Sequence, residues 1–151
     1  MPTDPNLRER ALRFLAAREH SRAELKRKLS PHAESAEQLE TLLEELVGKK
    51  QQSDARFAEL RSHVLSRKFG ASRIAHDLRS KGVSDEEAAH AVEAARATDL
   101  ERAREVYARK FREPPASRED RARRMRFLQA RGFSFDVIKA VIAGTPDEGE
   151  D

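Results

Sequence analysis

Basic side chains recur at similar positions along the chain, and they are the residues with the clearest capacity for recognition chemistry. The planar arginine fork pairs bidentately with carboxylates and phosphates, whereas lysine adds a flexible point charge. Such residues indicate a surface that binds a polyanion or an acidic protein, although ordinary solubilising charge is the plain alternative for any one of them. The candidate contact residues are Arg22, Arg27, Lys28, Arg67, Arg73, Arg79, Lys81, Arg109, Lys110, Arg121, Arg123, Arg124, Arg126 and Arg131.

Residues for catalysis or metal binding do not form a recognisable set in the sequence. The five histidines stand singly, without an HExxH pair, and the chain has no cysteine to act as a thiolate ligand or nucleophile. The glycines build no phosphate-binding loop, and adjacent glutamates such as Glu44 and Glu45 are typical of a solvated helix face. The sequence therefore predicts a protein that is not an enzyme and that uses no metal or cofactor.

The elements that carry the basic residues repeat along the chain. When the stretch 67–83 is shifted forward by 50 residues, Leu78 falls on Leu128 and a glycine falls on a glycine. When it is shifted back by 49 residues, Leu78 falls on Leu29. Self-similarity at a fixed period is the signature of a repeat architecture. The chain is therefore predicted to hold three copies of one structural unit.

Apolar spacing predicts that each copy consists of three helices, nine in all. Capping-box sequences, in which Glu follows Ser or Thr after three residues, open several of these helices, as at Ser21 and Thr98. No segment alternates with period two over the length of a strand, so the predicted fold is all-α. Two of the predicted inward-facing stripes are Leu39, Leu42, Leu43 and Leu46, and Phe57, Leu60 and Val64.

The similarity of the three copies in sequence indicates a domain organisation of three tandem three-helix repeats. The predicted boundaries are 6–52, 53–97 and 98–144, followed by a disordered acidic tail at 145–151. Repeats that stack in register form an elongated, curved helical array in which each unit contacts its neighbours. In such an array the basic second helices lie side by side, and their arginines form one positive stripe.

Composition supports thin helical layers over a single thick core, because 38% of the residues are apolar and 38% are charged. Intrinsic disorder is the alternative, but the apolar residues are spaced periodically. The opening residues lack the apolar core of a signal peptide, and no run approaches membrane-spanning length. We expect a cytoplasmic protein that is a monomer.

Several sequence motifs together resemble those of the RecX family of bacterial recombination regulators. The segments 11–15 and 18–29 resemble the opening signature of that family, and 53–59 followed by 70–83 resembles the central one. The segment 131–138 is similar to the C-terminal signature. The polar link 49–52 departs from the family pattern, as does the Ser-Pro-His-Ala turn after the first basic helix, and these departures leave the angle between the first two repeats open.

The resemblance implies a regulator that binds the RecA recombinase filament on single-stranded DNA. It implies inhibition of the ATPase, strand-exchange and co-protease activities of RecA, with the basic stripe lodged in the filament groove. The alternative is a helical protein that binds DNA directly and without sequence preference, acting without RecA. Weak binding of single- or double-stranded DNA is compatible with both hypotheses, and an inert scaffold predicts neither activity.

Overall fold

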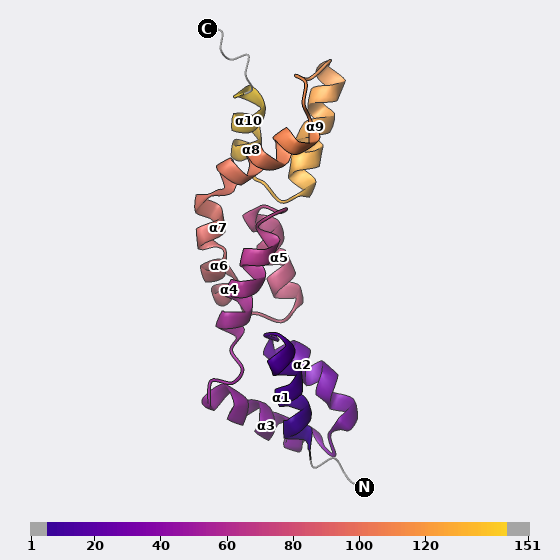
Figure 1. Ribbon diagram of the computed structural model, residues 1–151, viewed down its shortest axis with the longest axis vertical. Coiled ribbons are helices and arrows are strands. Elements are labelled where there is room, and N and C mark those ends of the chain that lie inside the picture. The colour runs from indigo at the N-terminus through magenta and orange to yellow at the C-terminus, as the bar shows by residue number, and fades with distance from the viewer. Residues whose placement is uncertain (1–5, 145–151) are drawn as a thin grey trace. The chain divides into compact units, whose positions relative to one another are not determined.

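The computed structural model describes residues 6–144, so the predicted acidic tail at 145–151 lies outside the described residues. Over the described range the chain forms ten α-helices and one short 3-10 helix, with no β-strand (Figure 1). The prediction of an all-α fold is confirmed. The helices are α1 (Leu7–Ala17), α2 (Arg22–Leu29), η1 (Ser30–His32), α3 (Ala36–Gly48), α4 (Asp54–Leu65), α5 (Ala71–Ser80), α6 (Asp85–Ala91), α7 (Glu93–Ala97), α8 (Asp99–Lys110), α9 (Arg118–Ala130) and α10 (Phe135–Ala143).

The predicted number of nine helices is wrong, because the helix expected over 84–97 is divided at Val92 into α6 and α7. Val92 has φ −91° and ψ 2°, which departs from helical geometry at a single residue. Its side chain is nevertheless buried, so the apolar pattern runs through the break. The spacing of apolar residues therefore could not reveal that the helix is divided into α6 and α7.

The described chain divides into two compact units. Within the described residues, unit 1 comprises 6–61 and 78–88, and unit 2 comprises 62–77 and 89–144. Helices α4, α5 and α6 each contribute residues to both units, so the compact units do not follow the boundaries of the sequence repeats. The repeat boundaries at 6–52, 53–97 and 98–144 therefore stay predictions.

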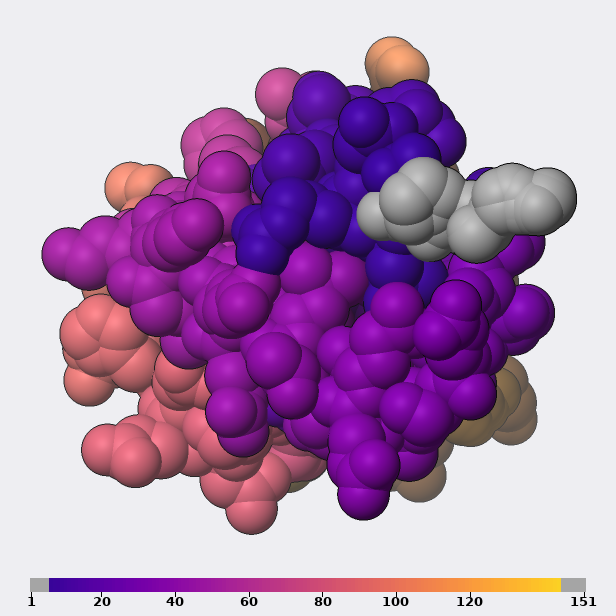
Figure 2. Space-filling model, turned by 90° about the horizontal axis from the view of Figure 1, so that it is seen from below, coloured from indigo at the N-terminus to yellow at the C-terminus, as the bar shows by residue number. Residues whose placement is uncertain are grey.

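The core of unit 1 is built from α1, α2 and α3. Apolar residues three and four apart place one stripe of each helix inward, as predicted for the four leucines of α3. Figure 2 shows the indigo surface of α1 beside the purple surface of α3. An ion pair joins Arg8 of α1 to Glu45 of α3. The buried residues are Leu7, Ala11, Leu25, Leu29, Leu39, Leu42, Leu43 and Leu46.

The core of unit 2 is built mainly from α8, α9 and α10. An aromatic cluster lies at its edge, where the ring centroid of Phe111 is 5.2 Å from that of Tyr107 and 5.5 Å from that of Phe127. Such tilted and edge-on pairs add to the burial of the rings. The buried residues of this core are Ala103, Val106, Tyr107, Leu128, Phe133, Ile138, Val141 and Ile142.

Helix α4 faces inward along a different line from the predicted one. Leu60 and Val64 are 54% and 59% exposed, whereas Phe57 and Ala58 are buried together with Ser62. Phe57 belongs equally to two helical stripes, one through residue 60 and one through residue 61. Helical spacing permits both, and the packing selects the second.

The predicted capping boxes have different outcomes at Ser21 and Thr98. Ser21 forms the complete box with Glu24, in which each side chain accepts from the other residue's backbone N–H. Thr98 caps nothing, because α7 ends immediately before it and its φ of −111° and ψ of 10° are not extended. Its hydroxyl lies 3.3 Å from the Ala95 carbonyl oxygen and accepts from Arg102 Nε at 3.0 Å.

Candidate partner interface

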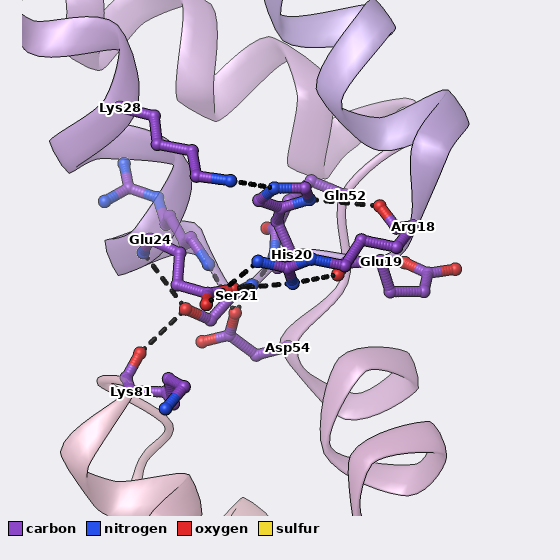
Figure 3. Close-up of polar contacts among 10 residues, drawn as sticks. Arg18, Glu19, His20, Ser21, Glu24, Lys28, Gln52, Asp54 and Lys81 are labelled. Carbon is purple, nitrogen blue, oxygen red and sulfur yellow. Dashed lines mark hydrogen bonds and ion pairs between the residues drawn. The ribbon is translucent and has the colours of Figure 1, made fainter. Parts of the chain in front are cut away.

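The N-terminus of the first basic helix, α2, is fixed within unit 1 by contacts with two later segments. The Ser21 hydroxyl donates to the Lys81 carbonyl oxygen at 2.7 Å, and the Arg22 N–H donates to Asp54 Oδ1 at 2.7 Å (Figure 3). Gly82 has a φ of +88°, and a Cβ built on it would lie 2.4 Å from Ala23 Cβ. Glycine is therefore required at position 82 by both conformation and space.

The same arrangement recurs within unit 2 at the N-terminus of α5. The Gly70 N–H donates to the Arg131 carbonyl oxygen at 2.7 Å, and the Ala71 N–H donates to Asp99 Oδ2 at 3.3 Å. Gly132 has a φ of +95°, and a Cβ on it would lie 2.3 Å from Arg73 Cβ. A Cβ on Gly70 would lie 2.5 Å from the Gly132 carbonyl oxygen, so close backbone approach, beyond helix capping, requires the glycine there.

We call these two arrangements the junctions, each made by a helix N-terminus, a carboxylate and a glycine turn. The first uses Ser21, Asp54 and Gly82, and the second uses Gly70, Asp99 and Gly132. Neither Asp54 nor Asp99 was among the residues singled out from the sequence. Their signal was the presence of aspartate at equivalent positions, directly after Ser53 and Thr98, in the second and third copies.

Polar groups buried at the first junction are satisfied by neighbouring side chains (Figure 3). Glu24 is 4% exposed and accepts from the Arg18 guanidinium at 3.2 and 3.3 Å. Burial opposes the charge of Glu24, but Arg18 and the Ser21 N–H outweigh it and lower the pKa of this carboxyl. Gln52 donates to the His20 carbonyl oxygen at 3.1 Å and to Asp54 at 2.9 Å, which holds that carboxylate toward α2.

His20 links the same junction to one of the candidate contact residues, Lys28. Burial lowers the pKa of His20, so the neutral ring is favoured. Its Nδ1 lies 3.0 Å from the Arg18 carbonyl oxygen and its Nε2 lies 2.9 Å from Lys28 Nζ. This geometry fits a ring that donates from Nδ1 and accepts from lysine at Nε2. Lys28 is therefore already engaged within unit 1.

At the second junction, the single side chain of Arg102 contacts several different groups. Its guanidinium donates to the carbonyl oxygens of Ser66, Phe69 and Ala95 at 2.6–2.7 Å and pairs with Asp99. Burial raises the pKa of Asp99, while the Ala71 N–H and Arg102 act against that rise. Arg102 was not among the candidate contact residues, and its role here is to hold unit 2 together.

Two of the five candidate contact residues of unit 1 lie beside carboxylates. Arg22 pairs with Glu40 at 2.8 Å, as does Lys26 at 2.7 Å, and Arg79 lies 3.8 Å from Asp85. Arg27 is exposed on α2, and Lys81 is half-buried. Part of the positive charge of unit 1 is thus paired with carboxylates. The continuous stripe predicted to run across both units stays a prediction.

Unit 2 gathers five cations around one groove of about 440 Å³, which we call the basic groove. Arg67 and Lys68 approach it from the segment after α4, Arg109 and Lys110 from the end of α8, and Arg131 from the end of α9. Its remaining lining residues are Val106 and Phe127. Four of the five cations were candidate contact residues, and Lys68 was missed although it directly follows Arg67.

The other candidate residues of unit 2 lie outside the basic groove. Arg73 is exposed, donates to the Ala130 carbonyl oxygen at 2.7 Å and covers the Phe69 ring at 4.5 Å. Arg121 and Arg126 are exposed on α9, where Arg123 pairs with Asp120.

Arg124 is a correction to the predicted contact set, because it is only 6% exposed. Its guanidinium donates to the Tyr107 hydroxyl at 2.9 Å and to the Glu113 carbonyl oxygen at 2.8 Å, and it lies 3.1 Å from Asp120. The residue fixes the proline-containing link before α9 onto α8. A guanidinium engaged in this way is unavailable to a partner, so we withdraw Arg124 from the set.

Among residues 6–144, no three His, Asp or Glu side chains gather as metal ligands would. Within the same range, none of the helices combines the length and apolar character needed to cross a bilayer.

Comparison with known proteins decides the family. Models of the first, second and third three-helix domains of RecX match residues 8–46, 53–92 and 97–142. The chain is 39% identical to the regulatory protein RecX of Ralstonia pickettii over 152 aligned positions, covering 100% of this chain and 96% of that protein. The chain belongs to the RecX family.

RecX relatives and structures cover nearly the whole chain. The regulatory protein RecX of Leptothrix cholodnii is 46% identical over 137 positions, covering 91% of this chain and 87% of that protein. The crystal structure of RecX from Lactobacillus salivarius has a TM-score of 0.78 at 20% identity, covering 89% of this chain and 90% of that one. The predicted family and the three-helix repeat fold are thereby confirmed, and the RecX relatives are regulatory proteins by name.

Proposed function

We propose that this RecX-family chain binds the RecA recombinase filament formed on single-stranded DNA and inhibits its ATPase, strand-exchange and co-protease activities. The observation that carries the proposal is the match of all three RecX domain models, in order, to residues 8–142. We expect the chain to act by binding, as a regulator without a catalytic step of its own.

The surface chemistry supports a negatively charged partner of this kind. Five cations line the basic groove, and Arg27, Arg121 and Arg126 are exposed outside it. A nucleoprotein filament offers both carboxylates and phosphates, which arginine and lysine recognise. The two junctions contribute by fixing the N-termini of α2 and α5, so that these basic helices are held rigidly when a partner binds.

Inhibition of RecA is tested by DNA-stimulated ATP hydrolysis. RecA filaments on single-stranded DNA are mixed with sub-stoichiometric amounts of this chain at low salt, and the steady-state rate is measured. We expect the rate to fall as the chain is added. An unchanged rate over the titration would remove the proposal.

Direct DNA binding without RecA is the second candidate function, and the cations of the basic groove favour it. A protein that neutralises phosphates releases counterions, so its affinity for DNA falls steeply with salt. Affinities for bare single-stranded DNA and for RecA-coated DNA separate the two functions. Tighter binding to the coated strand supports the regulator, and equal or weaker binding supports direct action on DNA.

A further inference from the structure

We propose that the basic groove of unit 2 binds an acidic peptide segment that carries an apolar side chain. The inference rests on the proposed function, because it names the kind of partner surface that the regulator would recognise. The groove brings together cations from three segments of the chain, at 67–68, 109–110 and 131. Its rim is positively charged and partly ordered, and its floor is apolar.

The cations of the groove have no carboxylate partner in the described part of the chain. Among residues 6–144, no ion pair joins a carboxylate to Arg67, Lys68, Arg109, Lys110 or Arg131. Two carboxylates of unit 2, Asp99 and Asp120, pair with other arginines. Of the residues that the structure describes, none that lines the groove is acidic. Like charges held together in this way repel one another, and an anionic ligand relieves that repulsion.

The rim is partly fixed before any ligand arrives. The Arg131 guanidinium donates to the Lys68 carbonyl oxygen at 3.2 Å and lies 4.9 Å from the Phe127 ring centroid. Lys110 Nζ lies 5.3 Å from the same centroid. Side chains restrained in this way lose less conformational entropy on binding than free ones. The groove therefore presents ordered cations.

The floor of the groove distinguishes a peptide from a nucleic acid. Val106 is buried and Phe127 is half-buried, so the floor is apolar. A base needs an open aromatic face on which to stack. The Phe127 ring is already occupied by Lys110, Arg131 and the edge-on contact with Phe111. An aliphatic side chain needs no open ring face and can pack against Val106 and the methylene stems of the surrounding cations, while flanking carboxylates reach the rim.

Fluorescence anisotropy with three labelled probes tests the proposal. The probes are a peptide of glutamate pairs separated by single leucines, a polyglutamate peptide of equal length, and oligothymidine. The groove variant Arg109→Ala/Lys110→Ala is compared with the control Arg104→Ala/Arg118→Ala, which removes the same charge from exposed sites of the same unit that are outside the groove and the candidate contact set. A second groove variant, Arg67→Ala/Lys68→Ala, guards against an effect of the first on folding.

We expect the leucine-containing peptide to bind more tightly than polyglutamate. We expect both groove variants to weaken it by about tenfold and the control by less than about twofold. Equal losses in groove and control variants would show diffuse charge attraction and overturn the proposal. The same holds if polyglutamate binds equally well, if no peptide binds, or if the groove variants weaken oligothymidine binding more than peptide binding.

The ATPase assay with RecA separates this inference from the proposed function. If the leucine-containing peptide binds the groove but the wild-type chain leaves RecA unaffected, the proposed function fails and the peptide site stands. If the wild-type chain and the groove variants inhibit RecA equally, the function stands and the groove has no part in it.

Discussion

At the scale of single residues, the structure explains why certain small and polar side chains stand where they do. Gly82 and Gly132 occupy the left-handed region and lie against the start of a basic helix. Asp54 and Asp99 accept backbone N–H groups at the same two helix starts. Both junctions thus depend on the absence of a side chain at one position and on the presence of a short carboxylate at another.

Replacing Gly82 by alanine tests the glycine requirement. The new methyl group would meet Ala23, and alanine is strained at a φ of +88°, so we expect a loss of about 1–3 kcal/mol in the free energy of unfolding. Urea denaturation measures it. Gly48→Ala is the control, because a Cβ there meets nothing within 4 Å, and it should leave stability unchanged or slightly raised. Equal midpoints for the two variants would contradict the argument.

His20 gives unit 1 a dependence on pH. Burial lowers the pKa of His20, so the unfolded chain takes up a proton more readily than the folded one. The stabilisation that neutral His20 gives to the folded state is therefore complete above about pH 6.5, the ordinary histidine pKa. It is lost as the pH falls from there toward the lower pKa of His20 in the folded state. The lowered pKa of Glu24 also stabilises the folded state, but this stabilisation is lost only when the pH falls below about 4.3, the ordinary glutamate pKa.

The substitution His20→Phe should remove that dependence, because phenylalanine keeps the ring contact with Phe14 and cannot be protonated. Denaturation curves are recorded at about pH 7.5 and pH 5.5, on either side of the ordinary histidine pKa. The wild type should be less stable at the lower pH, and the variant should show a smaller difference. His32→Gln, at an exposed histidine of the same unit, should keep the wild-type difference. A variant difference as large as that of the wild type would exclude His20 as its source.

At the scale of secondary-structure elements, the helix starts are held by groups from outside the helix as well as by local caps. Ser21 belongs to a local capping box, whereas the next N–H of α2, that of Arg22, donates to Asp54, which lies 32 residues later. A local sequence pattern predicts the first contact, whereas the second depends on the way the chain folds back.

Asp54→Ala tests the non-local cap. It leaves the Arg22 N–H of α2 without its acceptor and removes one of the two acceptors of the Gln52 side-chain amide, so we expect a loss of about 1 kcal/mol in the free energy of unfolding. Amide hydrogen exchange at Arg22 should become faster. Asp85→Ala, at an exposed carboxylate that opens α6, should cost less than about 0.5 kcal/mol. If Arg22 exchange stays at the wild-type rate, Asp54 does not hold this helix.

At the scale of the whole chain, α5 links the two compact units covalently. Its residues up to 77 belong to unit 2, and those from Leu78 belong to unit 1. Leu78 is fully buried. A disruption at this position should therefore be transmitted along one helix to both units.

Leu78→Asp places a carboxylate in a buried apolar site, and we expect a loss of more than about 3 kcal/mol. Thermal melting and hydrogen exchange measure it, and exchange should become faster in both units. Leu60→Asp introduces the same group at a leucine that is 54% exposed, so its effect should be small. Protection lost in only one unit would show that α5 does not couple them.

The sequence by itself determined the helical class and the repeat, because both follow from local spacing, and it indicated the family by the resemblance of its motifs. Leucines four apart share one helix face, and a serine with glutamate three residues later favours a helix start, as at Ser21. The apolar stripe of α3 and the glycine turns at 82 and 132 were predictable for this reason.

Only the tertiary structure decided which charges are open to a partner. Arg124 and Arg109 are alike in sequence, but one is enclosed by Tyr107 and the link before α9, and the other lines the basic groove. Contacts between residues distant in the chain decide this difference, as they decide the burial of Ser62 in place of Leu60. The physical reason is that the availability of a charge depends on its neighbours in space, and sequence spacing fixes only its neighbours along one helix.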